Sequence, residues 1–521
     1  MNRDAMLRKL VEHDKPWDMV IVGGGATGSG IALDAASRGY SVLLLEQNDF
    51  AKGTSSRSTK LAHGGVRYLQ QGNLSLVLEA LHERGLMIRN APHLVHNLPF
   101  VVPNYDWWEA PFYGIGLKLY SVLAGRHNLG ETRLLTREEA LERIPTIETH
   151  GLRGGVIYHD GQFDDSRFVI ALLQTATEQG ATVVNRMRVT GLEKSDGFVD
   201  GVTVHDEESG KDHQVRAKVV INATGPFSDA LRALDDPNAG AFIKPSQGVH
   251  IVIERRFLPG DNAIMVPHTD DGRVMFAIPW QNRVIVGTTD TPVHKIPLEP
   301  KPLKEEVDFL VGHASRYLSH DPSIDDVLSV FAGIRPLVGA ADENGNTAAI
   351  SRDHTIAISN SGLVTIAGGK WTTYRRMAEE TVNHASIIAR LDERPCVTSN
   401  LNLHGYHTHT ADFGELAEYG SDAPEIQILA DREKHLDERL HPNLPVIAAQ
   451  VVWAVREEMA RTVEDVLGRR TRCLLLDAKA SLEAAPKVAD IMERELKRGK
   501  HWAKDQVNEY EQLVSNYLPP K

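Results

Sequence analysis

Short apolar runs and segments with helical spacing alternate near the start of the chain. Met19–Val22 is an uninterrupted apolar run with the length of a buried strand. Residues 26–38 repeat apolar positions at helical intervals, and Ser41–Leu45 forms a second apolar run. Gly39 lies between them, where the left-handed end of a helix favours glycine. The order strand, helix, strand predicts a buried sheet covered by helices, as in α/β domains.

The turn between the first strand and its helix reads GGGATG, from Gly23 to Gly28. In a dinucleotide-binding turn, Gly23 allows the tight bend, Gly25 lets a pyrophosphate approach the backbone, and Gly28 lets helix and strand pack closely. The helix N-terminus offers free N–H groups and a positive dipole end to the phosphates. The alternative is a glycine-rich turn that binds nothing.

Glu46 ends the second strand, 18 residues beyond Gly28. A carboxylate at this distance accepts hydrogen bonds from a ribose and disfavours a 2′-phosphate. Strand, glycine turn, helix and acid together predict a dinucleotide site. The motif leaves both FAD and NAD open.

Two further stretches are predicted to approach the same ligand. Residues 51–69 read AKGTSSRSTKLAHGGVRYL, in which hydroxyl groups can donate hydrogen bonds and glycines remove bulk. An ordinary polar loop is the alternative for this stretch. Gly368–Gly369 leads into a helix start at residues 370–375, which places a second helix dipole near a ligand.

Later apolar runs complete the first sheet. Residues 180–184 predict a strand, and residues 189–204 a hairpin. Lys218–Asn222 and Leu363–Ala367 are apolar strands that lead into turns of small residues. Such turns occur where a chain returns to a nucleotide-binding sheet, so the first domain is predicted to be discontinuous.

The pattern changes between Phe242 and Phe331. Residues 250–253, 274–278 and 284–287 have the composition and spacing of antiparallel strands. They predict a second domain whose sheet faces the ligand of the first.

After Asn400 the chain is rich in Ala, Glu, Leu, Lys and Arg at helical spacing, over residues 445–467 and 480–513. This predicts a helical C-terminal domain. Its basic residues are predicted to form a solvated face; they are Arg469, Arg470, Arg472, Lys497, Arg498 and Lys500.

Two amphipathic stretches could contact a membrane. Residues 6–11 predict a short helix on the surface of the first domain, with membrane contact as the alternative. Residues 105–125 concentrate Trp107, Trp108, Phe112, Tyr113 and Tyr120 beside Lys118 and Arg126. Aromatic residues with flanking cations suit a membrane interface or a quinone access route. The same composition suits a core helix or a subunit interface, and both interpretations stay open.

Composition narrows the class of protein. With 521 residues, two to four domains are expected, and 42% apolar and 24% charged residues are typical of a soluble globular chain. A net charge of −13 argues against a general nucleic-acid binder. Cys396 and Cys473 are far apart, so we expect neither a disulfide framework nor a zinc site. A chain with so few cysteines is expected in a reducing compartment. The charged N-terminus is unlike a signal peptide, and no run of 18 apolar residues predicts a transmembrane helix.

Several motifs in order give the chain a specific resemblance. Over nearly its whole length it resembles the FAD-dependent glycerol-3-phosphate dehydrogenases of the respiratory, quinone-reducing kind. The motifs are GGGATG with Glu46, TSSRSTKLAHGGVRYL from Thr54, NATGPFSD from Asn222, GTTD from Gly287, AGIRPL from Ala332, SRDH from Ser351, AGGKWTTYR from Ala367 and EEMARTVEDVLGRRTRCLLLD from Glu457.

The resemblance implies an α/β fold class with three parts. They are a discontinuous, Rossmann-like FAD-binding domain (residues 1–95, 151–241 and 332–395), an antiparallel-sheet substrate domain of the amino-acid-oxidase type (96–150 and 242–331) and a C-terminal α-helical cap domain (400–521). It also implies FAD as cofactor, and a cytoplasmic homodimer bound peripherally to the inner face of the cytoplasmic membrane, with a quinone as electron acceptor.

The resemblance also assigns residues. Those implied to line FAD are Gly23, Gly25, Gly28, Glu46, Ser55, Ser56, Lys60, Leu61, His63, Gly65, Ala223, Gly225, Gly368, Lys370 and Thr372. Those implied to face the substrate are Arg67, Tyr68, His250, Arg335, Arg352 and Lys370. One departure precedes the histidine: position 247 is Gln, where some members of the family have lysine.

The implied reaction oxidises sn-glycerol 3-phosphate to dihydroxyacetone phosphate, with hydride transfer from C2 to flavin N5. The C2 hydroxyl then needs a base of near-neutral pKa, for which we expect His250. A core histidine bonded to the backbone is the alternative. Arg335 and Arg352 suit a dianionic phosphate, because arginine binds it with two parallel charge-assisted bonds. Arg67 and Lys370 would add positive potential near the flavin, and we count His250, Arg335 and Lys370 as candidate catalytic residues.

Three other functions stay open. A related oxidase would pass electrons to oxygen, although such members tend to carry an inserted segment. An amine or amino-acid oxidase of the same superfold would need no phosphate-binding cluster. A non-catalytic nucleotide-binding protein would keep the glycine motif and could dispense with His250 and the two arginines.

Overall fold

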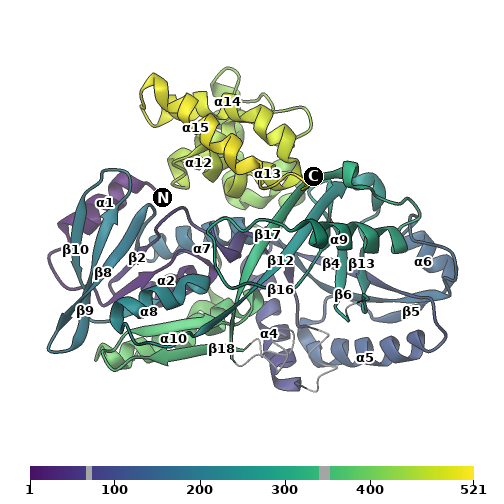
Figure 1. The fold of residues 1–521 in the computed structure, drawn as a ribbon, viewed down its shortest axis with the longest axis horizontal. Helices are drawn as coiled ribbons and strands as arrows, with labels where there is room; N and C mark the ends of the chain where they lie inside the picture. The colour runs from purple at the N-terminus through teal and green to yellow at the C-terminus, as the bar shows by residue number, and fades with distance from the viewer. Residues whose placement is uncertain (66–72, 271, 340–352, 521) are drawn as a thin grey trace.

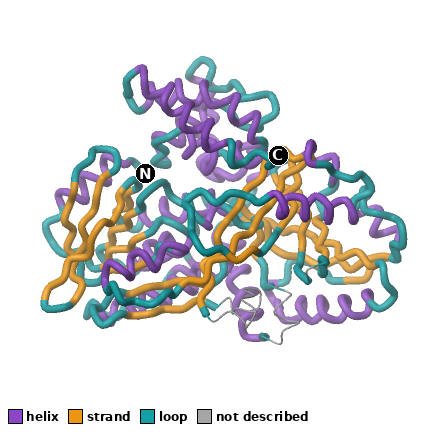
Figure 2. Tube along the Cα trace, viewed as in Figure 1, coloured by secondary structure: helices purple, strands orange, loops and turns teal. Residues whose placement is uncertain are grey.

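The computed structural model describes residues 1–65, 73–270, 272–339 and 353–520, and it has the predicted three-part fold class (Figure 1). An α/β part lies at the left of the view, a large sheet with its helices at the right, and a helical domain above both. The tube view shows strands in the two lower parts and a helical upper part (Figure 2).

The first part is organised around a six-stranded sheet, in the order β18-β19-β11-β1-β2-β7. Its central strand β1 is fully buried and pairs in parallel with β2 and β11. The strands are β1 (Met19–Val22), β2 (Val42–Leu45), β7 (Thr182–Val184), β11 (Val220–Asn222), β18 (His354–Ile358) and β19 (Val364–Gly368). A separate three-stranded sheet comprises β8 (Met187–Ser195), β9 (Phe198–Asp206) and β10 (Asp212–Arg216). Strands β7, β11 and β19 belong to the six-stranded sheet, so the predicted returns of the chain to this sheet are confirmed.

Helices cover this sheet because their apolar faces need partners. The helices of this part are α1 (Arg3–Glu12), α2 (Ala26–Ser37), α4 (Leu74–Asn90), α7 (Asp165–Glu178), α8 (Ser228–Asp235) and α10 (Tyr374–Ile388). In α1, Met6 and Leu10 are buried in the core of the domain, so the packed surface helix predicted for residues 6–11 is confirmed.

The second part is a ten-stranded sheet with antiparallel pairing throughout most of its length. Its strands are β3 (Leu61–Ala62), β4 (Val95–Asn104), β5 (Arg133–Leu135), β6 (Gly154–Phe163), β12 (Ile243–Glu254), β13 (Ala263–Val266), β14 (Met275–Trp280), β15 (Arg283–Gly287), β16 (Thr291–Pro292) and β17 (Val327–Val338). Its helices are α5 (Glu109–Ala124), α6 (Arg137–Arg143) and α9 (Lys304–Tyr317).

Two strands that the domain boundaries drawn from the sequence give to the first part, wholly or in part, pair within the large sheet. Strand β6 begins after residue 151 but pairs with β4 in the large sheet over its whole length. Strand β17 continues past residue 331 while it pairs with β12. A long strand carries the chain from one part to the other, so the pairing partners, and not the apolar pattern, decide where a segment lies.

The third part is helical and packs on the large sheet. Its helices are α11 (Ala423–Arg432), α12 (Ala448–Glu457), α13 (Cys473–Leu476), α14 (Ala478–Glu495) and α15 (Lys500–Val514), with a π-helical turn, η10 (Asp465–Arg470). Its core also contains Val252, Trp280 and Phe331 of the large sheet. Short 3₁₀ segments connect elements throughout; they are η1 (Thr54–Ser56), η2 (Gly125–His127), η3 (Gly225–Phe227), η4 (Arg255–Phe257), η5 (Ile324–Asp326), η7 (Trp371–Thr373), η8 (Thr398–Asn400) and η9 (Thr410–Asp422).

The solvated basic face predicted for the C-terminal domain is wrong for three of its residues. Arg469, Arg470 and Arg472 are buried, whereas Lys497 and Arg498 are exposed as predicted. The three arginines point toward the α/β part, where buried carboxylates neutralise them. Charge along a helix cannot reveal such partners, because they come from distant parts of the sequence.

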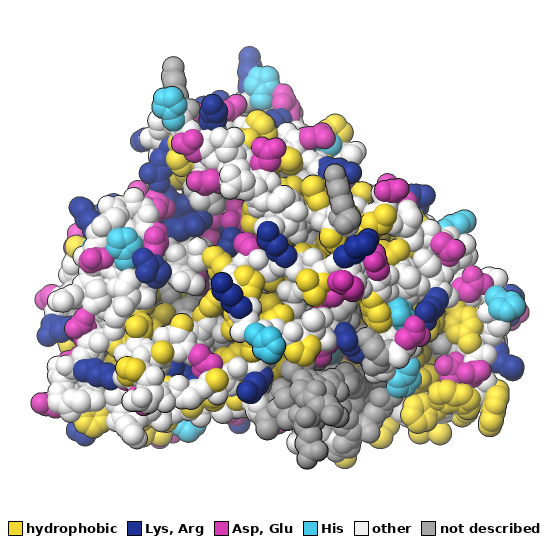
Figure 3. Space-filling view, in the orientation of Figure 1, with side chains coloured by type: hydrophobic (Ala, Val, Ile, Leu, Met, Phe, Trp, Pro, Cys, Tyr) yellow, Lys and Arg dark blue, Asp and Glu magenta, His cyan; other side chains and the backbone are white. Residues whose placement is uncertain are grey.

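Helix α5 combines the two interpretations of residues 105–125. Tyr113, Leu117 and Tyr120 are buried against the large sheet. The opposite face leaves apolar side chains in solvent, at Trp107, Trp108, Phe112, Ile115, Leu119 and Val122. In the space-filling view, hydrophobic side chains gather at the lower right, where α5 runs in Figure 1 (Figure 3). Among the described residues, no helix is long and apolar enough to cross a membrane.

The contact between Gly28 and Gly23 gives a test of this packing. A Cβ added to Gly28 would lie 1.9 Å from the Gly23 carbonyl oxygen. Gly28→Ala is therefore expected to lower the free energy of unfolding by roughly 3 kcal/mol, measured by urea denaturation. Gly116→Ala in α5 is the matched control, because its Cβ would meet no described atom within 4 Å. There the better helix propensity is expected to raise stability by up to about 1 kcal/mol. Equal stability of Gly28→Ala and the wild type would contradict the packing described.

Candidate active site

A cavity of about 470 Å³ opens at the carboxyl ends of β1 and β2, where ligands bind in open α/β sheets. Its wall combines residues from five ranges of the chain, 22–27, 45–55, 187–190, 223–234 and 368–377. The residues of the wall that the sequence singled out are Gly23, Gly25, Glu46, Ser55, Ala223, Gly225, Gly368 and Lys370.

Backbone approach explains the glycines of the GGGATG turn. Gly23 has a φ of +113°, a region that favours glycine, and a Cβ there would lie 2.5 Å from the Ala223 carbonyl oxygen. Gly28 is not part of the cavity wall; it packs directly against Gly23. Gly25 is the N-cap of α2, so the start of the helix lies at the cavity. This geometry suits a phosphate group next to the helix dipole.

Glu46 is tied to the glycine turn. Its carboxylate accepts hydrogen bonds from Gly24 N–H (2.7 Å) and Asn48 N–H (2.9 Å). Desolvation raises the pKa of Glu46, and the two backbone donors act in the opposite direction. The side chain is thus fixed at the end of β2, on the cavity wall.

The loop after Glu46 forms the side of the cavity that faces the helix. Lys52, Gly53, Thr54 and Ser55 line it. Ser55 Oγ accepts a hydrogen bond from Ala26 N–H at the first turn of α2 (2.8 Å), and Trp371 Nε1 donates to the Ser55 carbonyl (3.1 Å). Hydrogen bonds therefore join the loop to the start of α2 and to the start of η7.

Several residues assigned to FAD by resemblance are not part of this wall. Lys60 Nζ is buried and donates to Asp165 (2.7 Å) and to the Ser56 carbonyl (2.9 Å). Burial lowers the pKa of Lys60 to about 8, against the opposing charge of Asp165. The remaining members of this group are Ser56, Leu61, His63, Gly65 and Thr372. His63 N–H donates to Thr372 Oγ1 (3.1 Å), which joins two of them.

Arg67, Tyr68 and Arg352 lie outside the described residues. Their assignment to the substrate therefore stays a prediction.

The structure brings His250 and Arg335 to one place on the large sheet. Strands β12 and β17 pair side by side, with Ser246 opposite Arg335 and His250 opposite Phe331. A Cβ on Gly248 would lie 2.4 Å from the Arg335 guanidinium, so the arginine extends over this glycine. Side chains at alternate positions share a face of a strand, so the guanidinium lies over the face that carries His250.

His250 is buried and stacks on Phe331, with 4.8 Å between the ring centroids. Its Nε2 lies 2.9 Å from Thr59 Oγ1, whereas the buried Nδ1 makes no hydrogen bond to a described residue. Burial, followed by the charges of Lys60 and Arg335, lowers the pKa of His250 well below its ordinary value. The near-neutral pKa expected for this base is therefore not found in the structure without ligands, because burial and two nearby cations disfavour the protonated ring.

Arg335 is held by the segments around it. Its guanidinium donates to the carbonyls of Gln247 (3.3 Å) and Thr289 (3.0 Å) and lies 3.2 Å from the Asp290 carboxylate. Gln247, where the sequence departs from part of the family, points elsewhere: its amide donates to Glu306 (2.8 Å). Because positions 247 and 250 of β12 point to opposite faces, the side chain of Gln247 does not share the face of His250.

The sequence did not identify some residues of the cavity wall. Trp371 belongs to the AGGKWTTYR motif and Lys52 to the polar stretch over residues 51–69, but the sequence assigned no role to either side chain. Met187 and Val189 reach the cavity from β8. Their apolar side chains resemble those of any strand, so the sequence contained no signal for them.

The cavity fits the dinucleotide that the motif predicts. A Cβ on Gly53 or Gly225, which both line it, would meet no described atom within 4 Å. The start of α2 and the fixed Glu46 supply a helix dipole and a ribose acceptor along one wall.

Comparison with known proteins first defines the class. A family model described as FAD dependent oxidoreductase matches residues 18–375, and one described as C-terminal domain of alpha-glycerophosphate oxidase matches residues 360–506. The fold and the cavity are thus those of an FAD-dependent oxidoreductase, and FAD is the cofactor.

Relatives then narrow the family. The mitochondrial glycerol-3-phosphate dehydrogenase of Macaca fascicularis is 42% identical over 97% of this chain and 74% of its own length. That of Schizosaccharomyces pombe is 39% identical over 95% of this chain and 86% of its own length. A crystal structure of the glycerol-3-phosphate dehydrogenase from Bacillus halodurans, complexed with FAD, has a TM-score of 0.81 at 30% identity and covers 100% of this chain and 98% of that one. The chain belongs to the family of FAD-dependent glycerol-3-phosphate dehydrogenases.

More distant structures share the fold alone. The L-alpha-glycerophosphate oxidase from Mycoplasma pneumoniae is 18% identical, with a TM-score of 0.58, and covers 74% of this chain and 98% of that one.

The buried His250 and the part-buried His404 predict opposite dependences of stability on pH. The folded pKa of His250 lies below the unfolded value of about 6.5, so its contribution to stability is present above pH 6.5 and is lost as pH falls. In His404, bonds to Asp422 and Glu178 outweigh burial and raise the pKa to about 9. Its contribution is present below about pH 6.5 and is lost as pH rises toward 9.

Urea unfolding from pH 5 to 9 measures both effects. His250→Asn is expected to reduce the loss of stability on the acid side, and His404→Asn the loss on the alkaline side. Identical pH profiles for the wild type and both variants would contradict these assignments.

Proposed function

We propose that the protein oxidises sn-glycerol 3-phosphate to dihydroxyacetone phosphate and passes the electrons to a membrane quinone. The observation that carries the proposal is the buried His250 on the strand face over which the Arg335 guanidinium lies, in a sheet that adjoins the cofactor loop. A base and an anion-binding cation on one face suit a substrate that bears both an alcohol and a phosphate. The family to which the chain belongs supports the choice of substrate.

FAD would be held by the glycine turn, Glu46, Ser55, Ala223, Gly225 and Gly368. When bound, it supplies the two-electron acceptor of the reaction, taking the hydride of C2 at flavin N5. Lys370, on the same wall, adds positive charge beside it.

His250 is proposed as the base for the C2 hydroxyl. Phe331 fixes the plane of the ring by stacking. Thr59 Oγ1 can donate to Nε2 or accept from it, so substrate binding could replace this hydroxyl as the partner. A proton taken by the ring would be destabilised by Lys60 and Arg335, which favours its release in the next step.

Arg335 is proposed to bind the phosphate together with Arg352, while Arg67 and Tyr68 stay predicted to face the substrate. Asp290 and the two carbonyls fix the guanidinium in place, which reduces the entropy lost when an anion binds. The net charge of −13 repels a dianion at long range, so a local group of cations is needed to hold one.

The exposed face of α5 is proposed to contact the membrane surface from which quinone is drawn. From Phe112 to Val122 its exposed apolar side chains follow helical spacing, and Lys118 and Arg126 are exposed nearby. Aromatic groups with nearby cations suit the interface of an anionic bilayer. This supports a peripheral position on the inner face of the cytoplasmic membrane, where a homodimer would expose two such faces.

Anaerobic addition of glycerol 3-phosphate to purified holoenzyme tests the reaction. The flavin absorbance is expected to bleach, and His250→Asn is expected to slow bleaching about 10²- to 10⁴-fold, as for the loss of a general base. His205→Asn, a histidine on the three-stranded sheet, is the control and should bleach at the wild-type rate.

The electron acceptor is identified in the same sample, by reoxidation of the reduced flavin. Rapid reoxidation by a quinone analogue, with slow reoxidation by oxygen, is the expected result. Rapid reoxidation by oxygen with release of peroxide would favour the oxidase instead. Flavin that stays oxidised with glycerol 3-phosphate would overturn the substrate assignment.

Co-sedimentation with vesicles of anionic phospholipid tests the membrane surface. Ile115→Asp is expected to reduce the bound fraction at least several-fold, because a charge is placed within the apolar face of α5. Ile387→Asp is the matched control, since Ile115 and Ile387 are both 73% exposed and Ile387 lies on α10. If both variants bind like the wild type, α5 does not contact the bilayer. If wild type and Ile115→Asp differ in dimerisation instead, the face joins two subunits.

A further inference from the structure

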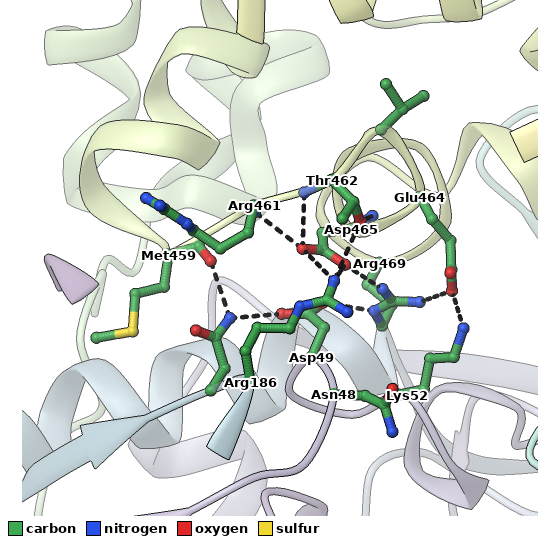
Figure 4. Close-up of polar contacts among 12 residues, drawn as sticks. Asn48, Asp49, Lys52, Arg186, Met459, Arg461, Thr462, Glu464, Asp465 and Arg469 are labelled. Atoms are coloured by element: carbon green, nitrogen blue, oxygen red, sulfur yellow. Dashed lines mark hydrogen bonds and ion pairs between the residues drawn. The ribbon is translucent and has the colours of Figure 1, made fainter. Parts of the chain in front are cut away.

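Three arginines of the C-terminal domain reach into the α/β part and contact the loop that lines the cofactor cavity. They lie on η10 and the turn after it, and the loop spans residues 49–60. Figure 4 shows Arg469 between Asp49 and Glu464, and Glu464 in turn beside Lys52.

The first end of the loop is fixed through Asp49. Arg470 binds both carboxylate oxygens of Asp49, at 2.7 and 2.8 Å, and Arg469 Nε donates to the same group at 2.5 Å. All three side chains are buried. Two guanidinium groups on one carboxylate set its position closely, because each planar donor group has a preferred geometry.

The cavity wall itself is reached through Lys52. Its ammonium lies between Glu464 of the C-terminal domain (2.5 Å) and Glu299 of the segment after β16 (2.7 Å). Arg57, further along the loop, also binds Glu299 (2.7 Å). One cavity-lining side chain is therefore held jointly by the other two parts of the molecule.

The far end of the loop is fixed through Arg472. Its guanidinium donates to the Ser56 carbonyl (2.7 Å) and to Asp165 (3.0 Å). Asp165 in turn accepts from Ser58 N–H (3.0 Å) and Lys60 Nζ (2.7 Å). The backbone is thus tied to Arg472 directly at Ser56 and through Asp165 at Ser58.

The loop needs such support. Ala51 and Lys60, near its two ends, have φ values of +62° and +63°, which cost non-glycine residues free energy and persist where the surroundings impose them. Between them, Ser55 bonds to the first turn of α2, where a phosphate would lie. A shift of the loop would move Ser55 and Lys52 away from the cofactor.

Burying this many charges is costly, and apolar packing could join two domains without that cost. The use that best accounts for buried ionic groups is specification of one conformation. We propose that Arg469, Arg470, Arg472 and Glu464 are positioning residues through which the C-terminal domain holds the 49–60 loop closed on FAD. The domain then sets the affinity for the cofactor without contacting it. This inference rests on the proposed placement of FAD in the cavity.

The test measures how fast holoenzyme releases FAD after dilution, by the rise of free-flavin fluorescence. Glu464→Gln keeps the shape of the side chain and removes the charge that holds Lys52. Arg472→Lys keeps the charge and loses the planar donor group that bonds to Ser56 and Asp165 together. Each is expected to release FAD at least ten-fold faster than the wild type.

Arg461→Gln is the control. Arg461 also joins the C-terminal domain to the α/β part, through two bonds of 2.7 Å to Glu208, but contacts no described residue of the 49–60 loop. Its release rate is expected to stay within two-fold of the wild type.

Release within two-fold of the wild type in Glu464→Gln overturns the proposal, whether or not Arg472→Lys folds. Equal acceleration in Arg461→Gln also overturns it, since any weakened interface would then suffice. Wild-type protein that binds no flavin would instead contradict the placement of FAD on which the proposed function depends.

Discussion

The close approach of three backbone segments at the edge of the central sheet underlies the rest of this structure. Gly23 turns the chain out of β1 beside Ala223, and Gly28 lets α2 pack against that turn. Side chains at these points would separate helix and strand, because an added Cβ would lie as little as 1.9 Å from a carbonyl oxygen. The start of α2, the position of Glu46 and the shape of the cavity all follow from this contact.

The second requirement is the placement of the loop over residues 49–60, on which all three parts of the chain converge. The α/β part supplies Asp165, the segment after β16 supplies Glu299, and the C-terminal domain supplies three arginines. Thr59, from the same loop, contacts His250 on the large sheet. One short segment thus joins the cofactor cavity to the candidate base, so the conformation of the loop bears on both binding and chemistry.

Sequence patterns predicted the parts of the structure that depend on local order. The turn at Gly23–Gly28 could be recognised because its residues are adjacent, and β1 and α2 because burial imposes a period on their apolar positions. Strand β6 could not be assigned to its sheet, since pairing with β4 is decided by contacts distant in sequence. The burial of Arg470 was missed for the same reason: its partner Asp49 lies 421 positions earlier.

A crystal structure of the holoenzyme with glycerol 3-phosphate bound would test the central claim most directly. The C2 hydroxyl is expected within about 3 Å of a ring nitrogen of His250, and the phosphate against Arg335. A substrate bound away from the β12 and β17 face, with the His250 ring still paired to Thr59 and its other nitrogen enclosed by protein, would contradict this claim.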